Sequence, residues 1–122
     1  MNPSITDLMV RNLADVFGEG DPVRRRRAIA ELWAEDGAFF APDGIHRGHD
    51  AIDRNAGAVR ATHPSFRYTP LGAPEEVHGT AGRVRWVSGE PGKPPAYAGT
   101  DIVVAHDGRI AELYMFFDPL PA

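Results

Sequence analysis

The chain has 122 residues, a formal net charge of −4 and no cysteine. This length predicts a single domain over residues 1–122, which can bury roughly two-thirds of its unfolded surface without a metal or disulfide. The lack of cysteine excludes disulfides and thiolate catalysis and is compatible with the cytoplasm, where we expect the protein to reside. The acidic balance disfavours a nucleic-acid partner. No apolar run approaches the length of a membrane span, and the first ten residues do not match a signal peptide.

Two helices are predicted in the first third of the chain. Residues 4–7 form a capping box with Ser4 as N-cap, and apolar residues then recur at helical spacing as far as Phe17. Gly18 and Gly20 are predicted to end this helix.

A second helix is predicted to start at Asp21-Pro22 and to close at residues 35–37. Its expected inward residues are Val23, Ile29, Ala30, Leu32 and Trp33. It contains the run Arg24–Arg27, which indicates either an anion-binding patch or a solvated helix face. We favour the solvated face, because four consecutive residues fan around a helix rather than forming a stripe.

The next segment is predicted to hold a short strand, a turn and a third helix. Residues 38–41 are apolar, and Pro42-Asp43-Gly44 is typical of a turn. Asp50 is the expected N-cap of a helix that continues to about residue 61, with Ile52, Ala56 and Val59 facing inward. His63-Pro64 then stops it, because the residue before proline disfavours helix.

The remainder of the chain has the pattern of strands and turns. The expected strands before the last hairpin are residues 66–71, 75–78 and 83–88, followed by an exposed loop at residues 90–95. Helices followed by an antiparallel meander predict an α+β fold: three N-terminal helices packed in a strongly curved, mostly antiparallel sheet. Such a sheet wrapped on helices leaves a cone with one open mouth, which suits a small-molecule ligand.

The last predicted hairpin, residues 96–118, has one acid inside an apolar strand, Asp101. A two-residue turn at Asp107-Gly108 would place Asp101 opposite Tyr114, whereas a bulged three-residue turn that includes His106 would place it opposite Leu113. We favour the bulged turn, because it gives a nearly continuous apolar concave face with one acid in it. That face would carry Tyr97, Gly99, Asp101, Val103, Ala111, Leu113, Met115 and Phe117.

The opposite face of the hairpin is also rich in apolar residues. It would carry Ile102, Val104, Ile110, Glu112, Tyr114 and Phe116. A monomer would leave too much apolar surface in water, so we expect a homodimer paired through this face.

The order of short motifs along nearly the whole chain resembles the nuclear transport factor 2-like superfamily, also called SnoaL-like or cystatin-like α+β barrels. The motifs are Leu32-Trp33-Ala34-Glu35-Asp36, Pro42-Asp43-Gly44, Gly48, Gly99-Thr100-Asp101, Asp107-Gly108-Arg109-Ile110 and Phe116-Phe117-Asp118. The resemblance implies three helices in the concavity of a bent sheet, usually in a dimer. The superfamily includes ketosteroid isomerases, polyketide cyclases, epoxide hydrolases, dehydratases and non-catalytic modules, so the fold alone does not determine the activity.

Compared with a ketosteroid isomerase, Asp101 falls at the position of the protonated acid of the oxyanion hole. The oxyanion tyrosine would fall near Asn12 and the catalytic base near Ala41, so both of these residues are missing. Asp43 lies close to the base position and is a possible substitute.

Asp101 is interpreted either as an acid with a raised pKa or as a solvent-facing, structural aspartate. Asp43 is the second catalytic candidate, although its simplest interpretation is a turn residue. The expected ligand-binding residues are Asn12, Trp33, Phe40, His46, Trp86, Tyr97, Leu113, Met115 and Phe117.

Residues 83–86 alternate in character, so either the two arginines or Val84 and Trp86 face the cone. Inward arginines would favour an anionic ligand, and an inward Trp86 would favour a ring; we favour the ring. His46-x-x-His49-Asp50 invites comparison with a metal site. The segment looks like a turn ahead of a helix, and zinc needs a third ligand, so we expect no metal and no cofactor.

Two hypotheses follow. The first is a cofactor-free isomerase, cyclase or hydrolase acting on a small apolar, oxygen-bearing ligand, with Asp101 as the acid. The alternative is a non-catalytic ligand-binding or accessory dimerisation module of the same fold. A second titratable group facing Asp101 would favour the enzyme, and Asp43 and His46 are the candidates.

Overall fold

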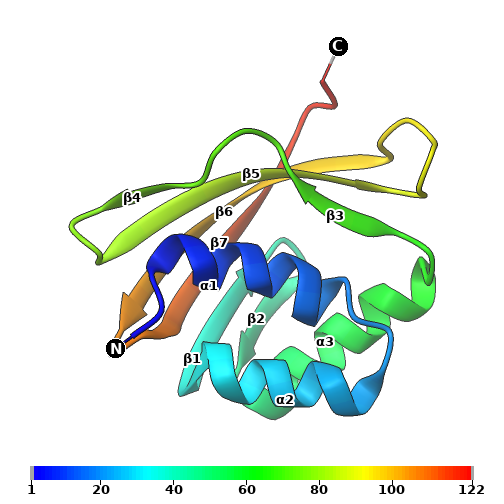
Figure 1. Cartoon of the computed structure of the whole chain (residues 1–122). Helices are drawn as coiled ribbons and strands as arrows, with labels where there is room; N and C mark the ends of the chain where they lie inside the picture. Colours follow the sequence, from blue (N-terminus) through cyan, green and yellow to red (C-terminus); the bar gives the residue numbers. More distant parts are fainter. Residues whose placement is uncertain (1, 122) are drawn as a thin grey trace.

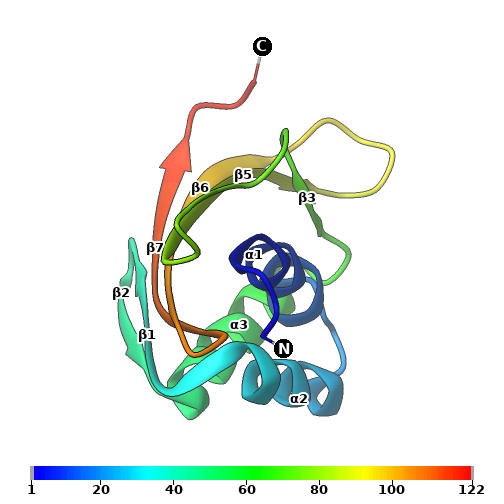
Figure 2. The same ribbon diagram turned by 60° about the vertical axis from the view of Figure 1, so that its left-hand side comes forward.

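The computed structural model describes residues 2–121 and shows an α+β fold. Three helices lie in the concavity of a strongly curved sheet, which Figure 2 shows wrapping around the first helix (Figures 1 and 2). None of the helices in this part of the chain has the length and apolarity that a membrane span requires.

The first helix begins and ends where the sequence predicts. The Ser4 side chain accepts a hydrogen bond from the Asp7 amide at 3.1 Å, and α1 (Ile5–Arg11) follows. The helix then widens into a π-helical segment (Asn12–Phe17), where the Gly18 amide donates to the Leu13 carbonyl at 2.9 Å. Both the predicted cap and the predicted end are therefore confirmed.

α2 (Pro22–Leu32) begins after its predicted cap, Asp21, but ends earlier than predicted. Its buried residues, Arg25, Ala28, Ile29 and Leu32, form one helical stripe. Val23 and Ala30 lie off this stripe and are exposed, so the prediction that they face inward is wrong. Trp33 is buried, but as the first residue of a strand that pairs with Ile110, which is why the helix does not continue to residues 35–37.

The arginine run is only partly solvated. Arg24, Arg26 and Arg27 are exposed, as predicted, but Arg25 is buried and the prediction is wrong for it. The Arg25 Nε donates to the Asp53 carboxylate at 2.9 Å, and its Nη1 donates to the Glu19 carbonyl at 3.1 Å. These partners offset the desolvation of the guanidinium and tie α2 to the third helix.

α3 (His49–Thr62) begins two residues earlier than predicted. Gly48 holds the cap position with a φ of 87°, a conformation that favours glycine, so Asp50 lies in the first turn and is not the N-cap. Ile52 and Ala56 are buried, as predicted, and the helix ends at His63, before the proline.

The sheet has seven strands in the order β2-β1-β7-β6-β5-β3, with the short β4 also paired to β5. Their bounds are β1 (Trp33–Ala41), β2 (Gly44–Arg47), β3 (Arg67–Pro70), β4 (Glu75–Val77), β5 (Ala81–Gly89), β6 (Tyr97–His106) and β7 (Arg109–Asp118). β1 and β7 are parallel, and the other pairs are antiparallel.

Two parts of the predicted architecture need correction. The sheet is open rather than a closed barrel, because β2 and β3 are its two ends and do not pair with each other. The helices are not all N-terminal to the sheet, because β1 and β2 precede α3 in the chain. β1 pairs in parallel with β7, so the first strand of the chain lies beside the last.

The turn of the β6–β7 hairpin is a two-residue turn, so the predicted three-residue turn is wrong. Asp107 and Gly108 have φ values of 52° and 74°, and His106 pairs with Arg109. Two positive φ values in a two-residue loop match the twist of the flanking strands. Asp-Gly meets this requirement, which is why the tighter turn forms.

A bulge two residues after the turn then changes the register. Ala105 pairs with Ile110, but Val104 pairs with Glu112, which leaves Ala111 unpaired. Asp101 consequently pairs with Met115, two residues from the predicted Leu113, and an even displacement preserves the face of each side chain.

Ile110, before the bulge, faces the core and is fully buried, so its predicted place on the outer face is wrong. Ala111 is the unpaired residue of the bulge, so it does not take its predicted place on the concave face.

The core lies between the concave face of the sheet and the three helices. Its most buried large side chains include Leu8, Met9, Val16, Ile29, Leu32, Trp33, Ile52, Val84, Val103, Ile110 and Leu113. The Trp33 indole donates to the Asn12 Oδ1 at 2.9 Å, which joins β1 to the π-helical segment inside this core. The packed end of the concavity is therefore closed by side chains, and the other end remains available for a site.

Without Ile110, the outer face of the hairpin still exposes apolar surface. Ile102 is 37% exposed and Phe116 is 55% exposed, and they flank the half-buried Tyr114. We predict a homodimer through this face, because pairing removes the apolar side chains from water. Light scattering at micromolar concentration should give a dimer mass, and Phe116→Lys should lower it to that of a monomer.

Val23→Lys is the matched control for that substitution, because Val23 is 66% exposed on α2, away from the hairpin. It should leave the dimer intact. A monomer mass for the unmodified chain would show that the outer face of the hairpin is not an interface.

Candidate functional site

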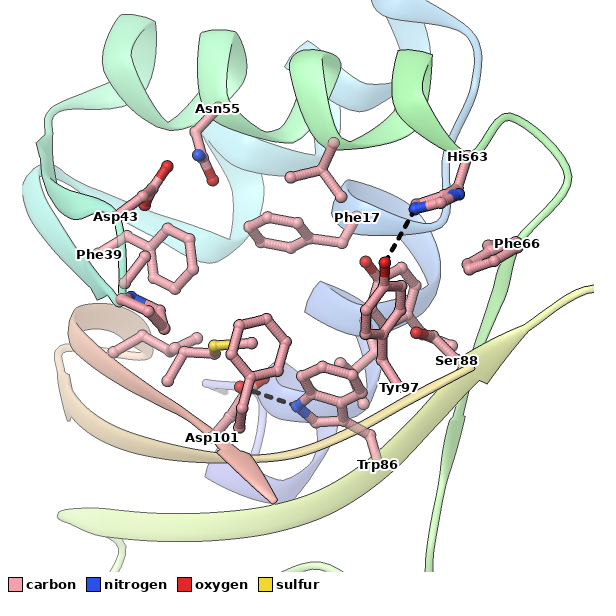
Figure 3. Close-up of a pocket in the computed structure, with 18 of the residues that line it drawn as sticks. Phe17, Phe39, Asp43, Asn55, His63, Phe66, Trp86, Ser88, Tyr97 and Asp101 are labelled. Atoms are coloured by element: carbon pink, nitrogen blue, oxygen red, sulfur yellow. Dashed lines mark hydrogen bonds between the residues drawn. The ribbon is translucent and has the colours of Figure 1, made fainter. Parts of the chain in front are cut away.

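The open part of the concavity is a cavity of about 330 Å³ between the sheet, the π-helical segment and α3 (Figure 3). This volume is within the range of small-molecule sites, which are typically ~300–1,000 Å³. The walls are mostly apolar and aromatic. The lining residues are Leu13, Phe17, Phe39, Ala41, Pro42, Asp43, Asn55, Val59, Thr62, His63, Phe66, Tyr68, Trp86, Ser88, Tyr97, Asp101, Leu113, Met115 and Phe117.

Asp101 lies on the sheet wall of this cavity and is only 4% exposed. It comes from β6, where its neighbours across the strands are Val84 and Met115. Arg83 and Arg85 face away from the cavity, whereas Val84 and Trp86 are buried, which confirms the predicted orientation of β5. No ion pair joins Asp101 to another described residue. Burial raises the pKa of the Asp101 carboxyl to about 7, although a hydrogen bond from Trp86 opposes the increase.

That hydrogen bond determines how the carboxyl group is held. The Trp86 Nε1 donates to the Asp101 Oδ1 at 3.0 Å (Figure 3). An indole N–H is a donor only, so it favours the unprotonated oxygen of a neutral carboxyl group and leaves the proton on Oδ2. The alternation of residues 83–86 predicted that Trp86 faces inward, but it did not predict this contact.

Gly99 makes room for the Trp86 indole. The two residues are partners across β5 and β6, and a Cβ at position 99 would lie 2.3 Å from the indole Cζ2. Any larger residue would therefore displace the ring that holds Asp101.

The structure places about half of the predicted ligand-binding residues at the cavity. Trp86, Tyr97, Leu113, Met115 and Phe117 line it, as do both predicted catalytic residues, Asp101 and Asp43. The positions on β5, β6 and β7 share one cause, because alternate residues of these strands face the concave side, whereas Asp43 reaches the cavity from the turn between β1 and β2.

Four predicted ligand-binding residues do not line the cavity. Asn12 and Trp33 form a hydrogen bond with each other inside the core and are at most 1% exposed. Phe40 faces the outside of the sheet, where its ring stacks on Tyr114 with the centroids 4.6 Å apart. His46 lies on β2, and its side chain forms a hydrogen bond with Asp43.

Asp43 lies at the rim, in the turn between β1 and β2. Its side chain is 66% exposed, and its Oδ1 is 3.1 Å from the His46 Nε2. His49 does not join this pair, because its Nε2 lies 3.0 Å from the Trp33 carbonyl and 3.1 Å from the Ala34 carbonyl. Across residues 2–121, no three His, Cys, Asp or Glu side chains gather as a set of metal ligands.

A second polar group lies nearer the rim, where the predicted Tyr97 meets three residues that were not predicted for the site: His63, Tyr68 and Ser88. The Tyr97 hydroxyl is 3.3 Å from the His63 Nε2, and the imidazole stacks on Phe66 with centroids 4.1 Å apart (Figure 3). Tyr68 and Ser88 also line the cavity. Burial, and secondarily the nearby Asp101, raise the pKa of the Tyr68 hydroxyl. The alternation of residues 66–71 carried a signal for Phe66 and Tyr68, but His63 was interpreted only as the end of a helix.

We predict that ionisation of Asp101 destabilises the fold. Its pKa is raised to about 7, so the folded chain binds the proton more tightly than the unfolded chain. The free energy of unfolding should therefore fall as the pH rises from about 4, the usual aspartate pKa, to about 7. In urea denaturation, the unmodified chain should lose on the order of 2–3 kcal/mol of its free energy of unfolding between pH 5 and pH 8. Asp101→Asn should not show this loss.

The corresponding control is Asp43→Asn, which alters an exposed carboxylate at the same cavity. It should leave the pH dependence of the unmodified chain in place. Carboxyl titration by NMR provides the direct measurement, and an Asp101 pKa at or below the usual aspartate value would contradict the prediction.

Comparisons with known proteins agree with this geometry. The pattern of the SnoaL-like domain family matches residues 10–113. A solved structure of a candidate isomerase of the SnoaL-like family from Agrobacterium tumefaciens is 29% identical, with a TM-score of 0.85, over 93% of this chain and 96% of that chain. A candidate polyketide cyclase from Sinorhizobium meliloti is 26% identical, with a TM-score of 0.67, over 90% of this chain and 94% of that chain.

A cystatin-fold protein from Novosphingobium aromaticivorans shares the fold alone. It is 11% identical, with a TM-score of 0.71, over 93% of this chain and 98% of that chain. A comparison with curated proteins gives no match. The family pattern covers most of the chain, and it includes α2, α3, most of the sheet and Asp101. The chain therefore belongs to the SnoaL-like domain family.

Proposed function

We propose that the chain binds a small, largely apolar ligand that carries a carbonyl oxygen, and that Asp101 acts on this oxygen as a neutral acid in a cofactor-free isomerisation or cyclisation. The observation that carries the proposal is the state of Asp101. It is buried in an apolar cavity, has no cationic partner among the described residues, and accepts one hydrogen bond from Trp86. Below about pH 7 such a carboxyl keeps its proton and is a hydrogen-bond donor.

The chemistry needs a donor that responds to charge on the ligand oxygen. When a proton leaves the carbon beside a carbonyl, negative charge develops on the oxygen. A donor already aimed at that oxygen then stabilises the transition state more than the ground state. The indole of Trp86 holds the Asp101 carboxyl in one orientation, so little reorganisation is required at that moment.

The base in this proposal is Asp43. It is the other carboxylate that lines the cavity, and Figure 3 shows it on a different wall from Asp101, near Asn55 of α3. A ligand between the two walls would meet an acid at its oxygen and a base at the neighbouring carbon. Similarity to a candidate isomerase and a candidate polyketide cyclase supports reactions of this type.

A non-catalytic ligand-binding module is the second candidate, and one observation favours it. The Asp43 side chain is 66% exposed and is bonded to His46, so it is a solvated carboxylate rather than a base activated by burial. In that case Asp101 would hold the ligand oxygen and no proton would leave the carbon.

Proton exchange on a simple ring ketone separates the two candidates. With 1-tetralone in D₂O, we expect the chain to accelerate exchange of the protons beside the carbonyl, measured by NMR against buffer. Asp101→Leu, which removes the donor at similar volume, should slow this exchange about a hundredfold, as the loss of one oxyanion donor typically does. The rate should fall as the pH rises past about 7, where Asp101 loses its proton.

Asp43→Asn should abolish the exchange while 1-tetralone still binds. Binding of 1-tetralone without any exchange would favour the non-catalytic module. Binding that is unaffected by Asp101→Leu would contradict both candidates, since both use the hydrogen-bond donor of that carboxyl group.

We also predict no appreciable isomerisation of a Δ5-3-ketosteroid. Ala41 offers no carboxylate at the position of the isomerase base, and Asn12 is bonded to Trp33 outside the cavity lining. The chain thus lacks that base and the tyrosine donor on the first helix. The formation of the conjugated enone can be followed by ultraviolet absorbance. Turnover near that of a true ketosteroid isomerase would show that the roles of these residues are wrongly assigned.

A further inference from the structure

Three hydroxyl-bearing residues form a row across neighbouring strands near the rim of the cavity. Ser88 of β5 pairs with Tyr68 of β3 on one side and with Tyr97 of β6 on the other. All three line the cavity. Residues paired directly across adjacent strands point to the same face, so the register itself brings these hydroxyl groups together. We call these three residues the hydroxyl row.

The hydroxyl row has hydrogen-bonding capacity to spare. Ser88 is only 2% exposed, and neither its hydroxyl nor that of Tyr68 bonds to another residue within 2–121. The Tyr97 hydroxyl has one partner, the His63 Nε2 at 3.3 Å, which is longer than a typical hydrogen bond. Among the described residues, the buried polar atoms that lack a partner lie elsewhere, on Asn12 and Arg60, and Tyr97 is 42% exposed, so these hydroxyl groups are in contact with the open space of the cavity. The hydroxyl row can therefore bond to a molecule that enters the cavity.

The hydroxyl row lies apart from Asp101. Tyr97 and Asp101 are four residues apart on β6, so their Cα atoms are separated by about 13 Å at the usual strand rise. Trp86 and Gly99 occupy the paired position between them. The Trp86 indole packs edge to face against Tyr68, with centroids 5.2 Å apart, and gives this middle part a flat apolar wall. The cavity thus has a polar group at each end and an aromatic surface between them.

The chemistry of the hydroxyl row selects a neutral partner. Hydroxyl groups and an imidazole both donate and accept hydrogen bonds, which suits an alcohol or phenol. No lysine or arginine is among the residues that line the cavity, so nothing there pairs with a carboxylate or phosphate.

We propose that the hydroxyl row is a recognition subsite for a hydroxyl group at the end of the ligand opposite its carbonyl. The preferred ligand is then a hydroxylated ring ketone. Its carbonyl oxygen bonds to Asp101, its ring lies against Trp86, and its hydroxyl group bonds to Tyr68, Ser88 and Tyr97. This inference rests on the proposed function, because Asp101 determines which end of the ligand carries the carbonyl.

Two ketones that differ only by the distal hydroxyl group test the subsite. Isothermal titration calorimetry should show that 6-hydroxy-1-tetralone binds about tenfold or more tightly than 1-tetralone, because a site built to bond a hydroxyl group rejects the analogue that lacks it. Tyr68→Phe, Ser88→Ala and Tyr97→Phe should each reduce this preference, and the triple variant should bring it close to one. The affinity for 1-tetralone should stay within about twofold in each variant that circular dichroism shows to be folded.

The matched control is Tyr114→Phe, which removes a tyrosine hydroxyl that bonds to Glu112 outside the cavity. It should change the affinity for neither ketone. Asp101→Leu should weaken the binding of both ketones by the same factor and leave the preference for the hydroxylated ketone intact.

The two ketones and these variants together distinguish failure of the subsite from failure of the proposed function. Equal binding of both ketones to the unmodified chain, or a preference that survives the triple variant, would overturn the subsite alone. Binding of both ketones that is unaffected by Asp101→Leu would overturn the proposed function alone. If neither ketone binds at millimolar concentration, both proposals are wrong.

Discussion

The hydrogen bond between the Trp86 indole and the Asp101 carboxyl is the interaction on which the site depends. A carboxyl in an apolar cavity would otherwise lack a partner, and burying an unpaired polar group is costly. The indole satisfies one oxygen without supplying a positive charge, so the acid is positioned while its pKa stays raised, at about 7. An arginine in place of Trp86 would hold the same carboxyl in its ionised form. The choice of a neutral donor therefore decides what chemistry Asp101 can perform.

That interaction in turn requires a particular pairing of β5 with β6. Gly99 must lie opposite Trp86, because only a residue without a side chain leaves space for the indole. The same register sets Ser88 beside Tyr97 and Val84 beside Asp101, so one pairing creates the acid, the aromatic wall and the hydroxyl row. A displacement by a single residue would turn all of them to the outer face.

The helices complete the cavity by packing rather than by supplying its chemistry. The Asn12–Trp33 hydrogen bond joins the π-helical segment to β1, and the Arg25–Asp53 ion pair joins α2 to α3. The first pair is fully buried, and in the second the Arg25 side chain is 9% exposed, so loss of Asn12 or Asp53 would leave a buried donor on Trp33 or Arg25 without this partner. These contacts hold Phe17 and the residues of α3 over the mouth of the cone, where they narrow the cavity to the size of a small ligand.

The sequence by itself determined the α+β fold class, most of the helix caps and strands, the inward orientation of Trp86, and the placement of Asp101 on the concave face. These features follow from local chemistry and from hydrophobic periodicity, which the chain carries in consecutive residues. Only the tertiary structure decided the turn, the bulge at Ala111 and the burial of Ile110, because a bulge is set by pairing with another strand. The early end of α2, the placement of Asn12 and the hydroxyl row depend on contacts between residues that are far apart in the chain. No local pattern specifies such contacts, because they exist only once the curved sheet has brought its strands together and packed them against the helices.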